Sequence, residues 1–261
     1  MKLLQGEIPE CHSMKSYPDK IYYDGNLELL KSTKISIIGA RKASKYAREL
    51  THKLSSTLSK NGICVVSGGA MGIDAIAHKG AGYADTISVL PCGVDIRYPA
   101  VNKNLLNEIQ KSGLLLSQFD IGFRATPWSF VVRNELVVAL GEVLVVAEAE
   151  LGSGSMRSIE FALKMKKEIF VLPHRVGESS ATQMLLKEGK AKAIYDIDEF
   201  VSRFTCNNIL QNNQHVKTDE FIEFCKSTPT YEEACKKFPT RIFEAELNGE
   251  IEVVNAKVML L

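Results

Sequence analysis

Residues 63–81 read ICVVSGGAMGIDAIAHKGA, and this stretch indicates the type of fold. It begins with an apolar run, Ile63–Val66, which is typical of a strand buried on both faces. A turn of small residues, Ser67–Gly69, follows the run directly, and from Gly72 to Ala81 apolar residues recur at helical spacing. A buried strand that passes through a glycine turn into a helix predicts one half of a βαβ unit and therefore a parallel sheet.

The same alternation of strand and helix continues on both sides of this stretch. The predicted strands are Ile35–Ile38, Ile63–Val66, Thr86–Leu90, Leu114–Leu116, Val143–Val146, Ile169–Leu172 and Ala193–Tyr195. The predicted helices are Tyr46–Lys60, Gly72–Ala81, Asn102–Gln110, Arg133–Leu140 and Ser158–Lys166. Strands that are apolar on both faces and separated by helices predict an α/β fold, an extended Rossmann-like, doubly wound and mostly parallel sheet.

Four of the predicted strands lead into loops of small residues. These loops contain Gly39-Ala40-Arg41, Ser67-Gly68-Gly69, Pro91-Cys92-Gly93 and Gly152-Ser153-Gly154-Ser155. In an open parallel sheet, ligands bind beyond the carboxyl ends of the strands, and exposed backbone N–H groups there suit phosphate. The alternative interpretation is that such turns contain glycine only because the backbone conformation requires it. This would account for one or two of these loops but less well for all four. The guanidinium of Arg41 can fork two hydrogen bonds to a phosphate, so the sequence predicts an anion site.

The charge distribution agrees with an anion site. The formal net charge is only +1, yet six bases and no acid lie between Lys31 and Arg48. A solvated basic face is the alternative interpretation of such a run. Residues 216–261 carry nine acids and six bases, so the excess of positive charge belongs to the first part of the chain.

Two further stretches contain residues that could carry chemistry. Asp74 and His78 are spaced four apart on one helix face, as in a catalytic pair, but no nucleophile accompanies them. We expect them to hydrogen-bond each other and organise the glycine loop, together with Gly39. The stretch 128–134, WSFVVRN, mixes aromatic rings with a base and an amide, and Trp128 or Phe130 could stack on a nucleic-acid base or belong to the core.

The composition excludes several classes of protein. Six cysteines occur without a CxxC pair, which favours a reduced, cytoplasmic protein with neither a zinc site nor disulfides. The chain has neither an apolar run of about 18 residues nor the apolar core of a signal peptide, so we expect no membrane association.

The chain is predicted to consist of two domains. Residues 1–20 form an N-terminal extension, residues 21–204 the Rossmann-like domain, and the polar residues 205–216 a linker. Residues 217–261 have three helical segments, including Asp219–Lys226 and Thr240–Leu247, and an Asn248-Gly249 turn before a hairpin, which predicts a winged-helix-like domain. Its acid excess argues against direct DNA binding.

The ordered motifs together resemble one known family over roughly residues 20–200. They are IGARKAS (38–44), SGGAMGIDAIAHKGA (67–81), VLPCGVDIRYPAVNKNL (89–105), LLLSQF (114–119), FVVRN (130–134), GSGSMRSIEFAL (152–163) and IFVLPH (169–174). The sequence is similar to the DNA-processing protein A (DprA/Smf) family. This resemblance implies a homodimeric, non-catalytic protein without cofactor or metal, which binds single-stranded DNA in a basic pocket. It also implies loading of RecA recombinase in DNA processing and homologous recombination during natural transformation, that is, in competence.

The resemblance and the loop analysis together give a set of expected DNA-binding residues. These are Arg41, Lys42, Ser67, Gly68, Gly69, Gly72, Trp128, Phe130, Arg133, Asn134, Ser153, Gly154 and Ser155. The chain departs from the family pattern at Met71, where arginine is common, at Glu135, where a second base often follows, and at Ser180–Gln183.

Three other functions are compatible with parts of the sequence. A cytokinin-activating phosphoribohydrolase of the LOG group would share the Rossmann-like fold, but its catalytic glutamate has only Glu160 as a counterpart, further along the helix. A nucleotide-sensing module would bind a mononucleotide tightly at the same loops. A winged-helix transcription factor would need a basic rather than an acidic C-terminal domain.

Overall fold

The computed structural model describes residues 1–212, 220–239, 241–247, 251–254 and 256–260. The chain divides into two compact units, Met1–Asn207 and Asn208–Leu261, and each is described by itself.

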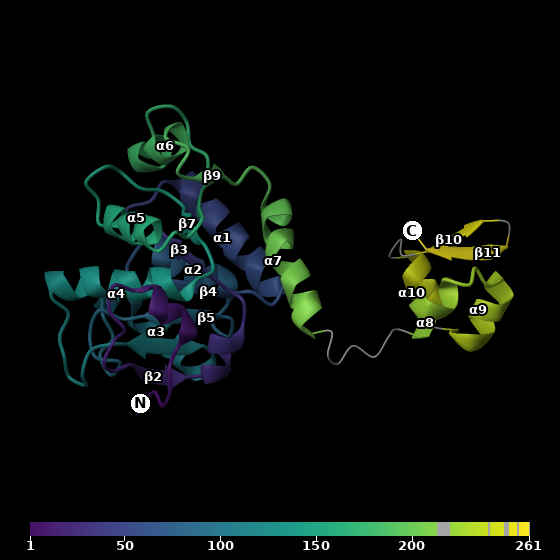
Figure 1. The fold of residues 1–261 in the computed structure, drawn as a ribbon, viewed down its shortest axis with the longest axis horizontal. Coiled ribbons are helices and arrows are strands. Elements are labelled where there is room, and N and C mark those ends of the chain that lie inside the picture. The colour runs from purple at the N-terminus through teal and green to yellow at the C-terminus, as the bar shows by residue number, and fades with distance from the viewer. Residues whose placement is uncertain (213–219, 240, 248–250, 255, 261) are drawn as a thin grey trace. The chain divides into compact units, whose positions relative to one another are not determined.

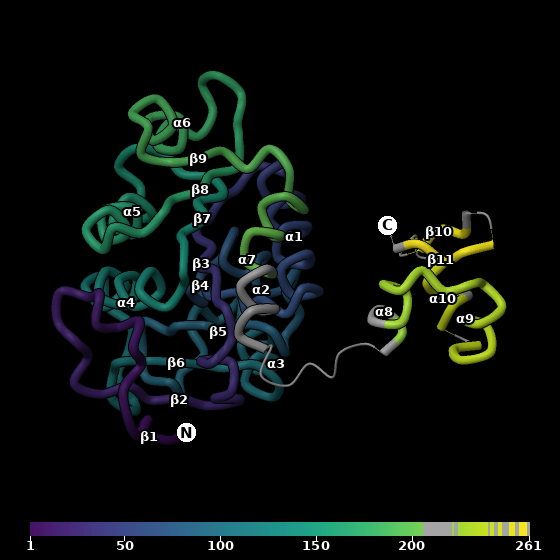
Figure 2. Tube along the Cα trace, turned by 45° about the vertical axis from the view of Figure 1, so that its right-hand side comes forward, coloured from purple at the N-terminus to yellow at the C-terminus, as the bar shows by residue number. Residues whose placement is uncertain are grey.

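A nine-stranded sheet forms the centre of the first unit (Figures 1 and 2). Its strands are β1 (Lys2–Leu3), β2 (Tyr22–Gly25), β3 (Lys34–Ile38), β4 (Cys64–Gly68), β5 (Thr86–Val89), β6 (Leu114–Ser117), β7 (Leu144–Val146), β8 (Ile169–Val171) and β9 (Lys192–Ala193). Their order across the sheet is β1-β2-β6-β5-β4-β3-β7-β8-β9. The seven strands β3 to β9 are parallel to one another. The strand β2 pairs antiparallel with β6, and β1 pairs antiparallel with β2.

Helices cover both faces of this sheet, as Figure 2 shows. One layer consists of α1 (Lys45–Lys60), α2 (Ile73–Ala81), α3 (Lys103–Ser112) and α7 (Ile197–Asn212), and the other of α4 (Pro127–Leu140), α5 (Ser155–Lys164) and α6 (Ser180–Lys187). Alternate residues of the central strands enter the cores on the two faces of the sheet: Ile37 packs in the same core as Leu54 of α1, and Ile38 in the same core as Val137 of α4. The prediction of a Rossmann-like, mostly parallel α/β sheet is confirmed.

The N-terminal segment is packed against this domain. Its short helix η1 (Pro9–Ser13) carries Cys11, which is fully buried, and Glu10, whose carboxylate lies 2.7 Å from Nζ of the buried Lys34. The backbone N–H of Lys15 donates to Glu135 of α4 over 2.9 Å. Glu135, which departs from the family pattern, therefore fastens the N-terminal segment to α4.

Several elements differ from the sequence-based expectation, among them two strands and the start of one helix. The strands β1 and β2 were not predicted, because they are short and lack the apolar run of the central strands; both lie at the antiparallel side of the sheet, with β1 at its edge. The prediction that α4 begins near Arg133 was wrong, since the helix begins at Pro127. Thr126 and Ser129 form a capping box at its N-terminus, and Pro127 at the first helical position favours the start of a helix there. Trp128 and Phe130 therefore lie on a helix rather than on a loop.

The second unit contains three helices followed by a hairpin. The helices are α8 (Glu220–Cys225), α9 (Tyr231–Lys237) and α10 (Arg241–Leu247), and the hairpin consists of β10 (Ile251–Val254) and β11 (Lys257–Leu260). Their small core contains Phe221, Cys225, Ala234, Ile242, Ala245, Ile251 and Val258. The predicted linker was wrong in its first part, because α7 continues to Asn212. The rest of that linker, and the predicted helix ends Asp219 and Thr240 and the turn Asn248-Gly249, lie outside the described residues.

Within the described part of the chain, no helix combines the length and the apolar character needed to cross a membrane.

Candidate functional site

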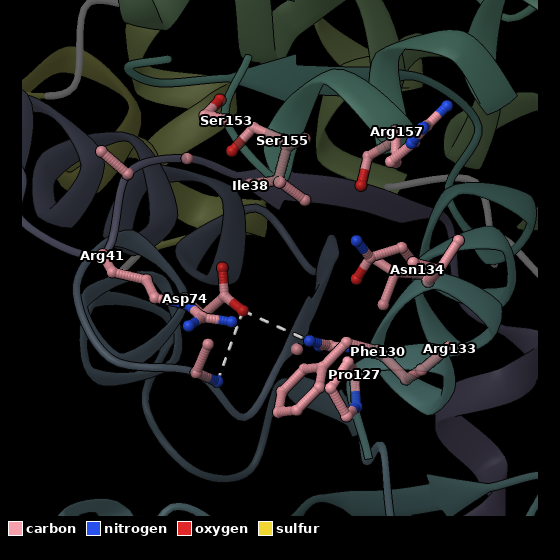
Figure 3. A pocket seen from close by; sticks show the side chains of 18 of the residues that line it. Ile38, Arg41, Asp74, Pro127, Phe130, Arg133, Asn134, Ser153, Ser155 and Arg157 are labelled. Carbon is pink, nitrogen blue, oxygen red and sulfur yellow. Dashed lines mark hydrogen bonds and ion pairs between the residues drawn. The ribbon is translucent and has the colours of Figure 1, made fainter. Parts of the chain in front are cut away.

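A cavity of about 740 Å³ opens at the carboxyl ends of β3, β4 and β7 (Figure 3). The chain leaves β3 toward β4 and β5, and later returns to place β7 on the other side of β3, so the cavity lies at the topological switch point of the sheet. Its walls come from the loops after these three strands, from the loop between β5 and α3, and from α4 and α5. The main lining residues are Gly39, Ala40, Arg41, Lys42, Gly68, Asp74, Tyr98, Phe130, Arg133, Asn134, Ser153, Gly154, Ser155 and Arg157.

Arg41 and Lys42 supply positive charge at the entrance. Both side chains are exposed, and no described carboxylate forms an ion pair with either. Arg41 reaches into the cavity from the side opposite α4 (Figure 3), and its guanidinium carbon lies 5.4 Å from the centre of the Phe130 ring. The two residues combine a cation with an aromatic face at the same point.

Phe130 is half-buried and stands on the first turns of α4. Its ring is also approached by the guanidinium carbon of Arg133, at 6.0 Å, and by the ring of Tyr98 in an edge-to-face arrangement, with 5.8 Å between the ring centres. The capping box that begins α4 fixes where this ring enters the cavity.

Arg133 lies below Phe130 and is only 4% exposed. Its Nη1 donates to the carbonyl oxygen of Val89 over 3.3 Å and lies 3.8 Å from Oδ2 of Asp74 (Figure 3). Burial raises the pKa of the Asp74 carboxyl, and the positive charge of Arg133 opposes this. A side chain at Gly68 would overlap the Arg133 guanidinium, so the close approach requires glycine there. Arg133 therefore forms part of the cavity floor instead of projecting into solvent.

His78 organises the glycine loop from behind the cavity. The ring is fully buried, with Nε2 donating to the carbonyl oxygen of Gly68 over 2.9 Å and Nδ1 lying 2.7 Å from the hydroxyl of Thr86. Burial lowers the pKa of His78 to about 4, so the ring is neutral. The prediction that Asp74 and His78 bond each other was wrong, because Asp74 accepts from the N–H of Ala70 and pairs with Arg133 instead.

The helix N-termini around the cavity differ in whether an acid already occupies them. Glu148 accepts hydrogen bonds from the backbone N–H and the hydroxyl of Ser44 at the start of α1. Glu150 does the same with Ser180 at the start of α6. By contrast, α5 begins at Ser155, and the residue in its capping position, Gly154, has no side chain to cap the helix; the nearby hydroxyl of Ser153 is buried without a described partner. The first turn of α5 is therefore the helix terminus available to an anion.

The structure brings together most, but not all, of the expected site residues. Arg41, Lys42, Gly68, Phe130, Arg133, Asn134, Ser153, Gly154 and Ser155 line the cavity, as do Gly39 and Asp74. Ser67, Gly69, Gly72 and His78 do not line it; Ser67 is buried and donates to the carbonyl oxygen of Ile37. Gly72 has φ +79°, and a side chain there would clash with the backbone of Ala40 and Arg41, so it shapes the loop.

Trp128 also lies outside the cavity lining. It is 62% exposed, and its ring lies in an edge-to-face arrangement with Phe119, with 5.8 Å between the ring centres. Conversely, the expected set lacked Tyr98 and Arg157, which do line the cavity. Both occur inside the motifs that resemble the family, at 89–105 and 152–163, and that was the signal available in the sequence. Among the described residues, His, Cys, Asp and Glu side chains form no group of three placed to hold a metal.

Comparisons with known proteins agree with this architecture. The sequence model of the family described as DNA recombination-mediator protein A matches residues 4–205. The DNA processing protein DprA of Streptococcus pneumoniae is 34% identical over 191 residues, which cover 72% of this chain and 67% of the relative. Protein Smf of Escherichia coli is 30% identical over 186 residues, 69% of this chain but only 50% of Smf, so the match spans about half the length of that relative.

Solved structures show the same fold. DNA processing protein A of Helicobacter pylori, described as having a unique single-stranded DNA binding mode, superposes with a TM-score of 0.75 and 38% identity, covering 81% of this chain and 96% of that one. The structure of DprA from Streptococcus pneumoniae gives a TM-score of 0.70 at 32% identity, covering 75% of this chain and 70% of that one.

Proposed function

This chain belongs to the DNA recombination-mediator protein A family, and from this premise we propose that it binds single-stranded DNA in the cavity and passes it to RecA recombinase. The observation that carries the proposal is the combination, in one cavity, of exposed cations that no described carboxylate pairs with, an aromatic ring and an uncapped helix N-terminus. Phosphates and bases alternate along a single strand, and this cavity offers contacts for both.

The proposed binding mode divides the work between two groups of residues. Arg41, Lys42 and the first turn of α5 hold phosphates, because charge-assisted hydrogen bonds and the helix dipole favour anions there. Phe130 stacks on a base, which gives little sequence preference. The Arg41 guanidinium lies over that ring, so a base that stacks on Phe130 displaces part of the Arg41 side chain from the ring face. Arg133 acts through position, by supporting Phe130 and Asp74 from below.

Duplex DNA suits the cavity poorly under this proposal. Its bases are already stacked on one another and cannot reach Phe130, while its phosphates alone would contact only the entrance. The protein should therefore prefer single strands.

We also propose that the protein is not an enzyme. Asp74 and His78 are both held by structural partners, and burial keeps His78 neutral. Glu160, the counterpart of the LOG-type catalytic glutamate, does not line the cavity and pairs with Arg157 over 2.9 Å. Release of free base from AMP by the purified protein, lost in Glu160→Gln, would overturn this part of the proposal.

The wider assignment rests on the family. We propose a homodimer that acts in the cytoplasm during natural transformation and homologous recombination, and a winged-helix-like second unit that serves protein contacts rather than DNA. The order of three helices and a hairpin and the acid excess of residues 216–261 support this role for the second unit.

A gel-shift comparison of a dT oligomer with a duplex of equal length, at two salt concentrations, tests the proposal. We expect the single strand to bind more tightly at both concentrations. Equal or tighter binding of the duplex would overturn the stacking mode.

A further inference from the structure

We propose that Tyr98 forms a second stacking surface beside Phe130, so that the site holds two consecutive bases of a single-stranded nucleic acid. This inference rests on the proposed function. It assigns a base-binding role to the loop between β5 and α3, which lies far in the sequence from α4.

Tyr98 has the exposure expected of a binding residue. The residue is 43% exposed although it lines the cavity, and no described residue hydrogen-bonds to its hydroxyl. An aromatic side chain that serves only the core is normally covered, and a buried tyrosine hydroxyl normally has a partner. The free face and the free hydroxyl of Tyr98 are therefore both available to a ligand.

The geometry of the two rings argues for two bases rather than one. The ring centres of Tyr98 and Phe130 are 5.8 Å apart, and the ring planes form an angle of 64°. A base inserted between two parallel rings needs about 7 Å between them, since each contact requires about 3.5 Å. The rings are too close and too inclined for that arrangement. Each ring can instead stack with its own base, and the bases of a single strand are free to splay apart at such an angle.

The loop that carries Tyr98 is held in place before any ligand binds. The side-chain amide of Asn102 donates to the carbonyl oxygens of Gly69 and Ala70, over 3.0 and 2.9 Å. On the other side of Tyr98, the guanidinium of Arg97 donates to Val94 O over 2.7 Å and to Asn107 over 3.0 Å. Both links reduce the ordering that binding would otherwise require, which favours affinity.

The surroundings of Tyr98 favour base contacts over phosphate contacts. Met71 follows Ala70, which accepts the Asn102 hydrogen bond, and Val101 precedes Asn102; both side chains are exposed and apolar. Met71 occupies the position at which the family pattern commonly has arginine. Neither Met71 nor Val101 lines the cavity, and the Tyr98 side chain adds an aromatic face rather than a charge, so its contribution to binding should depend little on salt.

The test uses the full chain and fluorescence anisotropy with a dT oligomer. Tyr98→Leu removes the aromatic face, Tyr98→Phe keeps it, and Tyr83→Leu is the matched control. Tyr83 is also a partly exposed tyrosine, but it precedes β5 and therefore lies at the amino ends of the parallel strands, whereas the cavity opens at their carboxyl ends. We expect Tyr98→Leu to weaken binding about fivefold or more without changing the salt slope, and the other two variants to bind like the parent.

A second oligomer, in which every other base is replaced by an abasic site, tests whether two neighbouring bases are bound. The parent should bind this oligomer more weakly than dT, and Tyr98→Leu should discriminate less between the two. The inference is overturned if the parent binds both oligomers equally, or if Tyr98→Leu binds dT like the parent. It is also overturned if Tyr98→Leu impairs only the transfer to the recombinase, which would make this surface a protein contact. Absence of dT binding by the parent would instead refute the proposed function itself.

Discussion

Nη1 of Arg133 lies 3.8 Å from Oδ2 of Asp74, and both side chains are buried beneath the cavity. This ion pair connects α4, which carries Phe130, to α2, whose N-terminus follows the glycine loop. The two walls of the cavity are therefore held together by a pair of charges that solvent screens weakly. The distance between the Phe130 ring and the glycine loop therefore depends on Arg133 and Asp74, although neither residue needs to contact the ligand.

Replacing Asp74 by Asn should destabilise the fold. The guanidinium of Arg133 would remain buried without its counter-ion, and breaking a buried pair from one side typically costs about 3–5 kcal/mol. Urea unfolding followed by circular dichroism measures the loss. Glu160→Gln is the control, because it breaks an exposed pair with Arg157 and should change stability far less. Equal stability of Asp74→Asn and the parent would mean that the pair does not hold the cavity together.

Stability should fall between pH 6.5 and pH 4 because of His78. Burial lowers the pKa of the folded-state ring to about 4, whereas in the unfolded chain it titrates near its ordinary value of 6.5. In this window the unfolded state binds a proton that the folded state does not, so stability rises with pH and is fully present above 6.5. The loss should amount to about 3 kcal/mol.

The measurement is the free energy of unfolding of the parent, His78→Gln and His52→Gln across this pH range. His52 is exposed on α1 and serves as the control for the loss of a histidine outside the core. His78→Gln should flatten the curve, whatever its absolute stability. A curve as steep in His78→Gln as in the parent would show that other groups cause the pH dependence.

Arg41→Ala should weaken binding of a dT oligomer more than Lys42→Ala, Lys45→Ala or Lys79→Ala. Arg41 lies at the cavity entrance beside Phe130, and loss of hydrogen bonds to a charged group typically lowers affinity about tenfold or more. Arg48→Ala is the matched control, since Arg48 is an exposed arginine of α1 outside the cavity lining. Unchanged binding by Arg41→Ala, with loss in one of the lysine variants, would place the DNA elsewhere.

The sequence indicates the sheet well because its signal is local. Runs such as Ile35–Ile38 are apolar on both faces, and the small residues that follow them mark the sheet edge where the cavity opens. Roles that depend on distant partners could not be read in this way. Nothing in the stretch FVVRN indicates that Arg133 turns inward, because its partners Asp74 and Val89 come from other segments.

The same limit applies to exposure and to helix ends. The apolar character of Tyr98 and Trp128 is similar in the sequence, but only the fold places Tyr98 in the cavity and Trp128 outside it. Glu148 reads as part of an acidic loop, and only the structure reveals that it occupies the start of α1. Charge and motif therefore indicated which loops surround the cavity, whereas the contacts inside it required the structure.

A chain ending at Asn212, the last residue of α7, should keep most of its intrinsic affinity for single strands. The second unit is acidic and should contribute few phosphate contacts. The salt dependence of binding is measured for both chains, because each lost contact lowers the slope by about 0.7 on single strands. If truncation lowers the slope of log affinity against log salt by about two or more, the second unit binds DNA directly.

The central claim is that a base of the bound single strand stacks on Phe130, and cross-linking measures this most directly. An oligomer with 5-iodouracil at successive positions is bound to the full chain, irradiated and digested, and the attached residue is identified by mass spectrometry. We expect the cross-link at Phe130, with its yield reduced in Phe130→Leu and in Arg41→Ala but not in Arg48→Ala. Cross-links confined to Trp128 or to residues of the second unit, with none at Phe130, would contradict the account.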